Sequence, residues 1–366
     1  MLFRSLEALG AGDDAGTARL LLLRAFSVNA ATNETDEPRA DSERALAIAV
    51  RLGDRAIELQ ALERLLMIRD DSTPDEWASL AELALAAGRF EVATRALRVQ
   101  ADASVGDHPF SALTIVDEAD RLAQARGLTE SRAWCNYTRA EAFFVLGEWD
   151  DAVTAGLRAV ALGEEHGYHR AVVRTWHTIL PIAAARGDVP LLARAGAWYA
   201  ARAGELARVD SLYGRIMSSA NHLRLAQVGL EPPFVPEPGP RLDAFELAYT
   251  GPSWLAALET VVEAWLAAGE LEAVGDALSR LRLVQTRLGA RLGTGMVDLL
   301  TARFGESGGP DAPEVAARRA LEGFHEVSAT WWAARAIKVL ERAGKVHKEL
   351  LAELAGVEQR LGAHVG

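Results

Sequence analysis

The sequence predicts an all-α fold, a right-handed α-α superhelix of helical hairpins that repeat about every forty residues. Apolar residues recur at helical spacing, strand-like alternation is almost absent, and glycines recur at a fixed interval. Six glycines follow one another in steps of 41, 40, 42, 40 and 40 residues: Gly106, Gly147, Gly187, Gly229, Gly269 and Gly309. Because glycine commonly ends a helix, this interval marks the turn inside each successive hairpin.

The N-terminal part, residues 1–127, is less regular than the rest. Helices are expected near residues 2–9, 14–29, 41–52, 55–69 and 108–126. The polar stretch ATNETDEPRADS, residues 31–42, predicts a loop. A capping box of Thr73 and Glu76, with Pro74 at the first helical position, starts a further helix that ends at Gly88, and its partner starts at Phe90. The sequence does not determine how residues 88–127 align with the forty-residue repeat.

The remaining chain follows the forty-residue interval with one interruption. The most regular helices are expected near 130–146, 149–166, 169–186, 189–204 and 208–228. Five prolines between Pro232 and Pro240 then predict an irregular segment within 229–252, because proline lacks the helical donor. Helices resume near 253–268, 271–288, 292–304, 313–325, 330–343 and 346–362, the last capping the array. We therefore expect one elongated domain over residues 1–366.

Composition and charge exclude several classes of function. The formal net charge of −12 disfavours nucleic acid as a direct ligand, because it repels phosphates. Cys135 is the only cysteine, so we expect no internal disulfide and no cysteine-based metal cluster, which fits a cytoplasmic location. No stretch has the length of a membrane span or the pattern of a signal peptide. Neither a membrane nor a cofactor is expected.

The unit from Ala133 to Leu162 carries a resemblance to a known repeat. Small residues bring its two helices together, a glycine makes the turn, and aromatic residues fill the space between them: Ala140, Phe143, Gly147, Trp149, Ala152 and Ala159. This unit resembles a tetratricopeptide repeat, with helices longer than usual. Weaker copies lie at 86–97, 185–196 and 267–278. Patterns at 45–62 and 317–344 are similar to the C-terminal solenoids of MalT-like and LuxR-type regulators and of related signalling ATPases.

The resemblance implies a scaffold and leaves the chemistry open. Members of those families carry a P-loop ATPase upstream and often a DNA-binding helix-turn-helix at the end, and neither pattern occurs here. The chain therefore corresponds to the sensor or interaction part, either alone or as part of a longer protein.

The resemblance also implies which residues line a concave groove. In tetratricopeptide arrays, positions 2, 5, 9 and 12 of the first helix in each unit point inward. Transferred to this sequence, these positions give an aromatic and cationic patch followed by an acidic one, with seven candidate contacts: Trp134, Tyr137, Glu141, Arg174, His177, Glu259 and Glu263. Phe144 occupies the last inward position of the first of these units. A register error of one residue would replace these positions with core residues. Glu259 and Glu263, one helical turn apart, read as part of a solvated acidic face.

Two short patterns suggest chemistry but fit a structural role better. Gly305 to Gly309 matches the G-x-S-x-G elbow of serine hydrolases around Ser307, yet the preceding segment predicts a helix where the elbow requires a strand. His166 and His169 flank the turn at Gly167, and His177 follows two helical turns later. These histidines read as solvated turn residues rather than zinc ligands. Most of the nine tryptophans are expected to pack in the core.

The leading interpretation is a non-catalytic binding module, the sensor or protein-interaction part of a bacterial signalling or transcriptional regulator. Its groove would bind a protein, a peptide or a small effector. The alternative is an enzyme, a hydrolase built on an α-α array with Ser307 or the histidine cluster at its centre. The position of Ser307 relative to a histidine discriminates between these readings.

Overall fold

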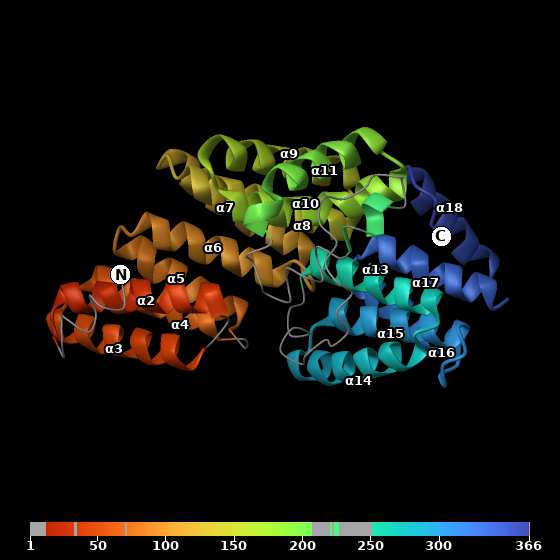
Figure 1. The fold of residues 1–366 in the computed structure, drawn as a ribbon, viewed down its shortest axis with the longest axis horizontal. Coiled ribbons are helices and arrows are strands. Elements are labelled where there is room, and N and C mark those ends of the chain that lie inside the picture. Colours follow the sequence, from red (N-terminus) through yellow and green to blue (C-terminus); the bar gives the residue numbers. More distant parts are fainter. Residues whose placement is uncertain are drawn as a thin grey trace. The chain divides into compact units, whose positions relative to one another are not determined.

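The computed structural model describes residues 12–32, 35–69, 72–206, 220–221, 223–226 and 251–365. Helices and the turns between them make up this part of the chain, and no strand occurs within it. Consecutive helices pack against each other as hairpins (Figure 1). The predicted all-α repeat array is confirmed.

The chain divides into two compact units. Unit 1 contains Met1–Ala103 and Ile115–Arg132, and unit 2 contains Ser104–Thr114 and Ala133–Gly366. The single domain expected over residues 1–366 stays a prediction.

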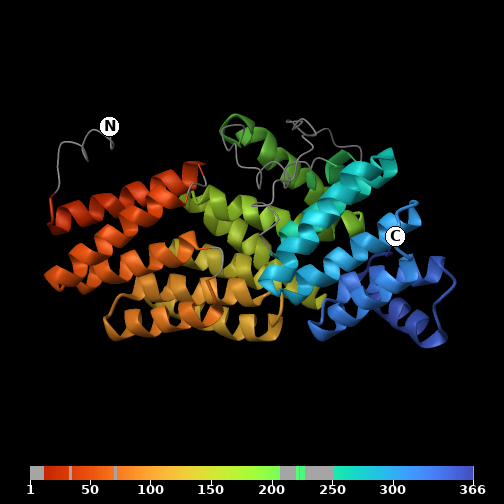
Figure 2. The ribbon, with the colours of Figure 1, turned by 90° about the horizontal axis from the view of Figure 1, so that it is seen from below.

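Unit 1 is a stack of antiparallel helices, which begins with the red helices in Figures 1 and 2. Its helices are α2 (Ala15–Thr32), α3 (Asp36–Leu52), α4 (Arg55–Ile68), α5 (Pro74–Ala86), α6 (Phe90–Ser104) and the second half of α7 (Pro109–Ala125). Alanine, leucine and isoleucine side chains of α2, α3 and α4 form its core, with Leu21, Ile48 and Ile57 among them. Small residues there let the helix axes approach closely.

Local capping explains where the helices of unit 1 begin. The capping box at Thr73 and Glu76 is present as predicted, with Pro74 in the first turn of α5. The loop predicted over 31–42 is wrong for most of its length, because α3 begins at Asp36. Acidic Asp36 and Glu37 favour a helix N-terminus, and Pro38 is tolerated in a first turn whose N–H groups need no intrahelical partner.

The described part of unit 2 contains five hairpins. These hairpins are α8 (Thr129–Leu146) with α9 (Trp149–His166), α10 (His169–Arg186) with α11 (Val189–Leu206), α13 (Pro252–Ala268) with α14 (Leu271–Leu288), α15 (Arg291–Glu306) with α16 (Pro313–Glu326), and α17 (Thr330–Arg342) with α18 (Lys348–Leu361). Only the part of α8 from Ala133 onward belongs to unit 2. Residues 220–221 and 223–226 are helical, within the helix predicted over 208–228. The proline-rich stretch Pro232 to Pro240 lies outside the described residues.

The glycine interval corresponds to left-handed turn residues. Positive φ angles occur at Gly127, Gly147, Gly167, Gly187, Gly269 and Gly289. Gly106 and Gly309 depart from this pattern. The left-handed residue near the latter is Gly308, with φ 101°. Gly309 instead makes room for Phe304, because a Cβ added at Gly309 would lie 2.7 Å from a ring atom of that side chain.

The first helix of each hairpin in unit 2 lies on one face, which we call the inner face. Within it α10 contacts α13, α13 contacts α15, and α15 contacts α17. The two ends of this series also meet. The Phe144 and Trp332 rings lie 5.3 Å apart, and Thr330 Oγ1 donates a 2.9 Å hydrogen bond to the Leu146 carbonyl. Unit 2 therefore closes on itself, so that α17 lies against the end of α8.

Candidate functional site

The residues predicted to line the groove lie on three inner helices, α8, α10 and α13. Their side chains are more buried than an open groove would allow. Four are nearly inaccessible: Tyr137 (1%), Glu141 (1%), His177 (2%) and Glu259 (6%). Trp134, Arg174 and Glu263 are partly exposed. The expectation of an open groove at those four positions is wrong, because their side chains are buried; Glu141 contacts Thr178 of α10 and His177 contacts Tyr199 of α11. As ligand contacts, the seven residues stay predictions.

The predicted residues on α8 and α10 make contacts within the inner face. Thr178 Oγ1 donates a 2.7 Å hydrogen bond to Glu141 Oε1, which joins α10 to α8. The Trp134 and Tyr137 rings meet edge to face with centroids 5.7 Å apart. The Glu141–Thr178 hydrogen bond therefore joins α8 to α10, whereas the Trp134–Tyr137 contact lies within α8.

His177 differs from the solvated histidine that the sequence predicted. Its ring is buried and stacks on Tyr199 of α11 at 6.4 Å. Burial, together with the positive charges of Arg174 and Arg224, lowers the pKa of His177 from 6.5 to about 3. The imidazole is neutral at physiological pH. His166 is exposed at the turn between α9 and α10, with His169 partly exposed beside it, and the described residues contain no group of side chains suited to hold a metal ion.

A chain of polar contacts continues from α11 to α13. Asn221 Nδ2 donates to the Tyr199 hydroxyl at 3.0 Å, and Arg224 donates to Asn221 at 3.4 Å. The same guanidinium also donates to the Ala256 carbonyl at 2.7 Å and to Thr260 Oγ1 at 2.8 Å. Burial lowers the pKa of Arg224 to about 10, so this side chain remains a cation inside the unit.

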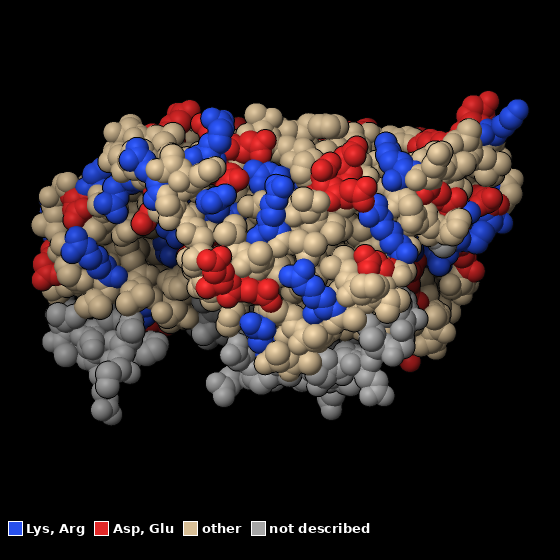
Figure 3. Space-filling view, turned by 90° about the horizontal axis from the view of Figure 1, so that it is seen from above, with Lys and Arg blue, Asp and Glu red and all other residues tan. Residues whose placement is uncertain are grey.

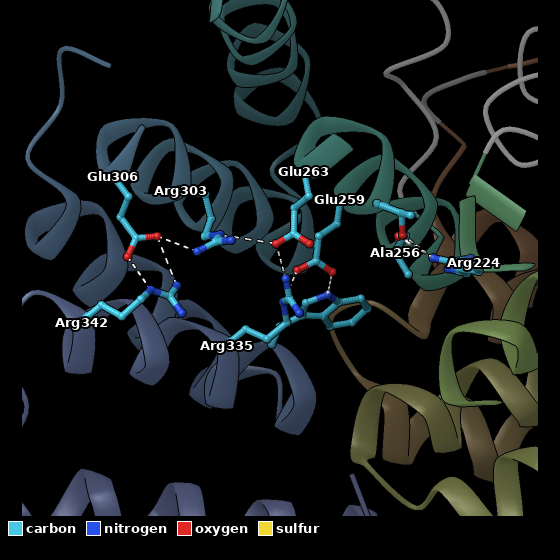
Figure 4. A network of polar contacts seen from close by, with 10 residues as sticks. Arg224, Ala256, Glu259, Glu263, Arg303, Glu306, Arg335 and Arg342 are labelled. Atoms are coloured by element: carbon cyan, nitrogen blue, oxygen red, sulfur yellow. Dashed lines mark hydrogen bonds and ion pairs between the residues drawn. The ribbon is translucent and has the colours of Figure 1, made fainter. Parts of the chain in front are cut away.

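Glu259 is a buried carboxylate rather than part of a solvated acidic face. Its Oε2 accepts a 3.1 Å hydrogen bond from the Trp332 indole, and its Oε1 lies 2.5 Å from Arg335 Nε. Burial raises the pKa of Glu259, while the neighbouring Arg335 opposes that effect. These contacts link α13 to α17 (Figure 4).

An ionic ladder runs from this pair toward solvent, as Figure 4 shows. We define it as Glu259, Glu263, Arg303, Glu306, Arg335 and Arg342, contributed by α13, α15 and α17. Arg335 also bonds to Glu263, whose carboxylate lies 3.4 Å from Arg303 Nε. The two ends of the ladder differ in exposure: the Glu259 side chain is 8% exposed and the Arg342 side chain is 40% exposed.

The outer end of the ladder opens into a cleft, which we call the Arg303–Arg342 cleft. Glu306 accepts from Arg303 at 2.7 Å and from Arg342 at 2.7 and 3.2 Å. Together with Pro313 and Ala343, these three side chains line a volume of about 440 Å³. Two guanidinium groups from successive repeats therefore converge on one carboxylate at an accessible surface.

Sequence reasoning found two members of the ladder, Glu259 and Glu263, and missed the four others. A signal exists for two of these four, Arg303 and Arg342. Glu263, Arg303 and Arg342 follow one another at intervals of 40 and 39 residues, so they occupy equivalent positions in three successive repeats. Comparison of charged residues at matched repeat positions would have identified them as neighbours on one face.

Ser307 lies at an exposed turn that ends α15. Its hydroxyl donates to the Arg303 carbonyl at 3.3 Å, a local bond to the preceding helical turn. The segment before it is helical, whereas a nucleophile elbow follows a strand. The G-x-S-x-G pattern therefore lacks the geometry of the hydrolase motif.

Several other predictions concern packing. Most tryptophans are buried as expected, with Trp77, Trp149, Trp176, Trp254 and Trp332 fully enclosed. No helix in the described part of the chain combines the length and apolarity needed to cross a membrane.

No family model matches the chain, and no curated protein matches it. Among solved structures, the chain is similar to one described as "Circular tandem repeat protein with novel repeat topology and enhanced subunit contact surfaces". The sequence identity is 16% and the TM-score is 0.22, covering 98% of this chain and 82% of that chain.

Proposed function

We propose that unit 2 is a non-catalytic binding module that holds an acidic peptide segment of a partner protein at the Arg303–Arg342 cleft. The observation that carries the proposal is the convergence of two guanidinium groups on Glu306 at the cleft opening. In this role the chain is the sensor or protein-interaction part of a signalling or transcriptional regulator. Its resemblance to the solenoids of MalT-like and LuxR-type regulators supports that assignment.

Guanidinium groups suit this role because their planar N–H donors match a carboxylate in a bidentate arrangement. Glu306 accepts hydrogen bonds from some of the N–H groups of Arg303 and Arg342. An incoming carboxylate would share these N–H donors with Glu306 or take its place. Arg303 is held in place from its other side by Glu263. The cleft volume of about 440 Å³ is within the range of ligand sites and suits one or two side chains of a peptide.

The surface charge favours a protein partner over nucleic acid. On the face in Figure 3, basic side chains are interspersed with acidic ones among the described residues. A nucleic-acid site would instead gather lysine and arginine into one patch or stripe. Arg303 and Arg342 therefore suit a short acidic segment of a protein, whereas the mixed charge of the surrounding surface does not favour a long nucleic acid.

Binding of synthetic peptides tests the proposal. A peptide rich in aspartate and glutamate should bind, whereas the matching peptide of asparagine and glutamine should not. We expect Arg342→Ala to weaken binding about tenfold, the loss of about 1.4 kcal/mol that fits one charge-assisted contact. Arg342→Lys should restore part of the affinity, because it keeps the charge and loses the bidentate geometry. Isothermal titration calorimetry measures each affinity.

Arg319→Ala is the matched control, because Arg319 also pairs with a single carboxylate, Asp298, but lies outside the cleft. It should bind the acidic peptide like the parent. Equal binding of the acidic and amide peptides, or an unchanged affinity in Arg342→Ala, would exclude the cleft as the site.

A further inference from the structure

Unit 2 has a second cavity, which shares no lining residue with the Arg303–Arg342 cleft. It has a volume of about 460 Å³ and is lined by the start of α7, the turn after α8, the turn between α16 and α17, and one face of α18. We call it the Thr330 cavity. Its lining includes Phe110, Glu148, Ser328, Thr330, Val357 and Arg360.

Much of the wall of the Thr330 cavity is apolar. Leu146, Ala333 and Val357 are buried side chains that line it. Phe110 lines it as well and is 65% exposed, and no other aromatic side chain in the described part of the chain is as accessible. An accessible ring beside buried aliphatic groups suits the side chain of a small apolar or aromatic ligand.

Opposite charges line the same cavity. Thr330 Oγ1 donates to the Leu146 carbonyl at 2.9 Å and accepts from Arg360 Nη2 at 3.4 Å. Glu148 follows Leu146 by two residues, and its carboxylate makes no ion pair or hydrogen bond with a described residue. The long contact with Thr330 is likewise the only one that the Arg360 guanidinium makes within the described structure. A cation and an anion are thus both available to a ligand.

Ser328 adds a hydroxyl group to the cavity wall at a cost in backbone strain. Its φ is 58°, and every other described residue with a positive φ is a glycine. Gly289, 39 residues earlier, makes the corresponding turn. Glycine adopts this conformation without a steric penalty, whereas serine is strained there. Such strain is typical of positions where the side chain itself has a role.

We propose that the Thr330 cavity binds a free α-amino acid with an apolar or aromatic side chain. Arg360 and the Ser328 hydroxyl donate to its carboxylate, and Glu148 accepts from its ammonium group. The ligand side chain lies against Phe110 and Val357. A zwitterion satisfies both charges of the cavity, whereas a simple amine or carboxylate leaves one of them without a partner.

Three related compounds test the choice of ligand by calorimetric titration of the full chain. Phenylalanine should bind saturably. Phenethylamine, which lacks the carboxylate, and phenylpropanoate, which lacks the ammonium group, should each bind about tenfold more weakly, the loss of one charge-assisted contact. Equal affinity for the three compounds, or no saturable binding of phenylalanine, would overturn the proposal.

Variants of the two charged residues should show a crossed pattern. Arg360→Gln should weaken binding of phenylalanine and phenylpropanoate about tenfold and leave phenethylamine unaffected. Glu148→Gln should weaken phenylalanine and phenethylamine and leave phenylpropanoate unaffected. If each variant weakens all three compounds alike, these residues do not contact the charged groups of the ligand, and the proposal fails.

Glu270→Gln is the matched control for Glu148→Gln. Glu270 precedes α14 as Glu148 precedes α9, and neither side chain caps its helix. Glu270 lies outside the cavity, so its variant should bind phenylalanine like the parent. The acidic peptide should bind Arg360→Gln with parental affinity, because the Arg303–Arg342 cleft is a separate site. The two proposals can therefore fail independently.

Two variants of Ser328 separate its hydroxyl from its backbone strain. Ser328→Gly removes both, so it should raise the melting temperature and weaken phenylalanine binding about tenfold. Ser328→Ala removes the hydroxyl and keeps the Cβ, so it should weaken binding equally without the gain in melting temperature. Parental affinity in both variants would contradict a contact between this hydroxyl and the ligand carboxylate.

Discussion

His177 shows how one position can be identified correctly and its environment misjudged. Helical spacing placed it on the inward face of α10, and it lies there. The sequence pattern gave no information on what would cover that face. Tyr199 stacks on the ring, and Arg174 and Arg224 add positive charge near it. A buried imidazole between cations stays neutral, which makes His177 sensitive to acid in a way that an exposed histidine is not.

Stability should therefore fall in mild acid because of His177. Its pKa is lowered to about 3 in the folded protein, while an unfolded histidine has an ordinary value of 6.5. Below pH 6.5 His177 binds a proton in the unfolded chain but stays neutral in the folded protein. Acid therefore favours unfolding until the pH approaches 3. This residue should contribute up to about 1.4 kcal/mol of lost stability for each pH unit in that window.

Urea unfolding between pH 6.5 and 4.5 measures this contribution as the slope of unfolding free energy against pH. His177→Gln should flatten the slope, because glutamine does not titrate. His347→Gln, which replaces an exposed histidine at the start of α18, should leave the slope as in the parent. If both variants keep the parental slope, His177 is protonated in the folded protein and the assigned burial is wrong.

At the scale of single helices, local signals in the sequence were sufficient for most of the fold. Glycines and the capping box mark helix ends, so predicted and observed boundaries agree closely from α4 to α18, apart from the region outside the described residues. Where a boundary depends on tertiary contact, the sequence has no local signal. α15 begins at Arg291 after Ala290, which has no capping side chain. Asp107, which is distant in sequence, accepts hydrogen bonds from the first N–H groups of α15 instead.

Asp107 should stabilise α15 across the repeat array. Its Oδ1 accepts from the backbone N–H groups of Arg291 at 2.9 Å and Leu292 at 3.4 Å. Both donors belong to the first helical turn, which has no intrahelical acceptor for them. We expect Asp107→Ala to lower the free energy of unfolding of unit 2 by about 1 kcal/mol, as for loss of an N-cap.

Asp107→Asn should lose much less stability, because the amide oxygen can still accept both hydrogen bonds. Thermal and urea unfolding compare the three proteins, and hydrogen exchange localises the effect to the start of α15. Equal losses in the alanine and asparagine variants would mean that the negative charge, rather than the hydrogen bonds, stabilises the helix end.

At the scale of the molecule, the sequence predicted the inward positions and missed the closure. The curvature of a repeat array is the sum of small rotations between neighbouring units, and these depend on packing details that periodicity does not encode. An open groove was therefore the default expectation. Phe144, at an inward position, contacts Trp332, one of the tryptophans expected in the core, and this ring pair joins the two ends of unit 2. Glu259, by contrast, is buried where α13 meets Trp332 and Arg335 of α17.

A double-mutant cycle tests the closure directly. Phe144 on α8 and Trp332 on α17 are separated by 188 residues in sequence, and their rings meet at 5.3 Å in an edge-to-face arrangement. If the ends of unit 2 meet in solution, Phe144→Leu and Trp332→Leu should not be additive. We expect a coupling energy of about 0.5–1.5 kcal/mol in equilibrium unfolding, typical of such aromatic pairs.

The control pairs Trp332→Leu with Trp77→Leu, because Trp77 is buried within unit 1 whereas Trp332 belongs to unit 2. That pair should be additive within about 0.5 kcal/mol, the usual limit for independent sites. Additive effects for Phe144 and Trp332 as well would mean that α8 and α17 stay apart in solution. In that case unit 2 is open between the end of α8 and the start of α17, and the two rings do not stabilise each other.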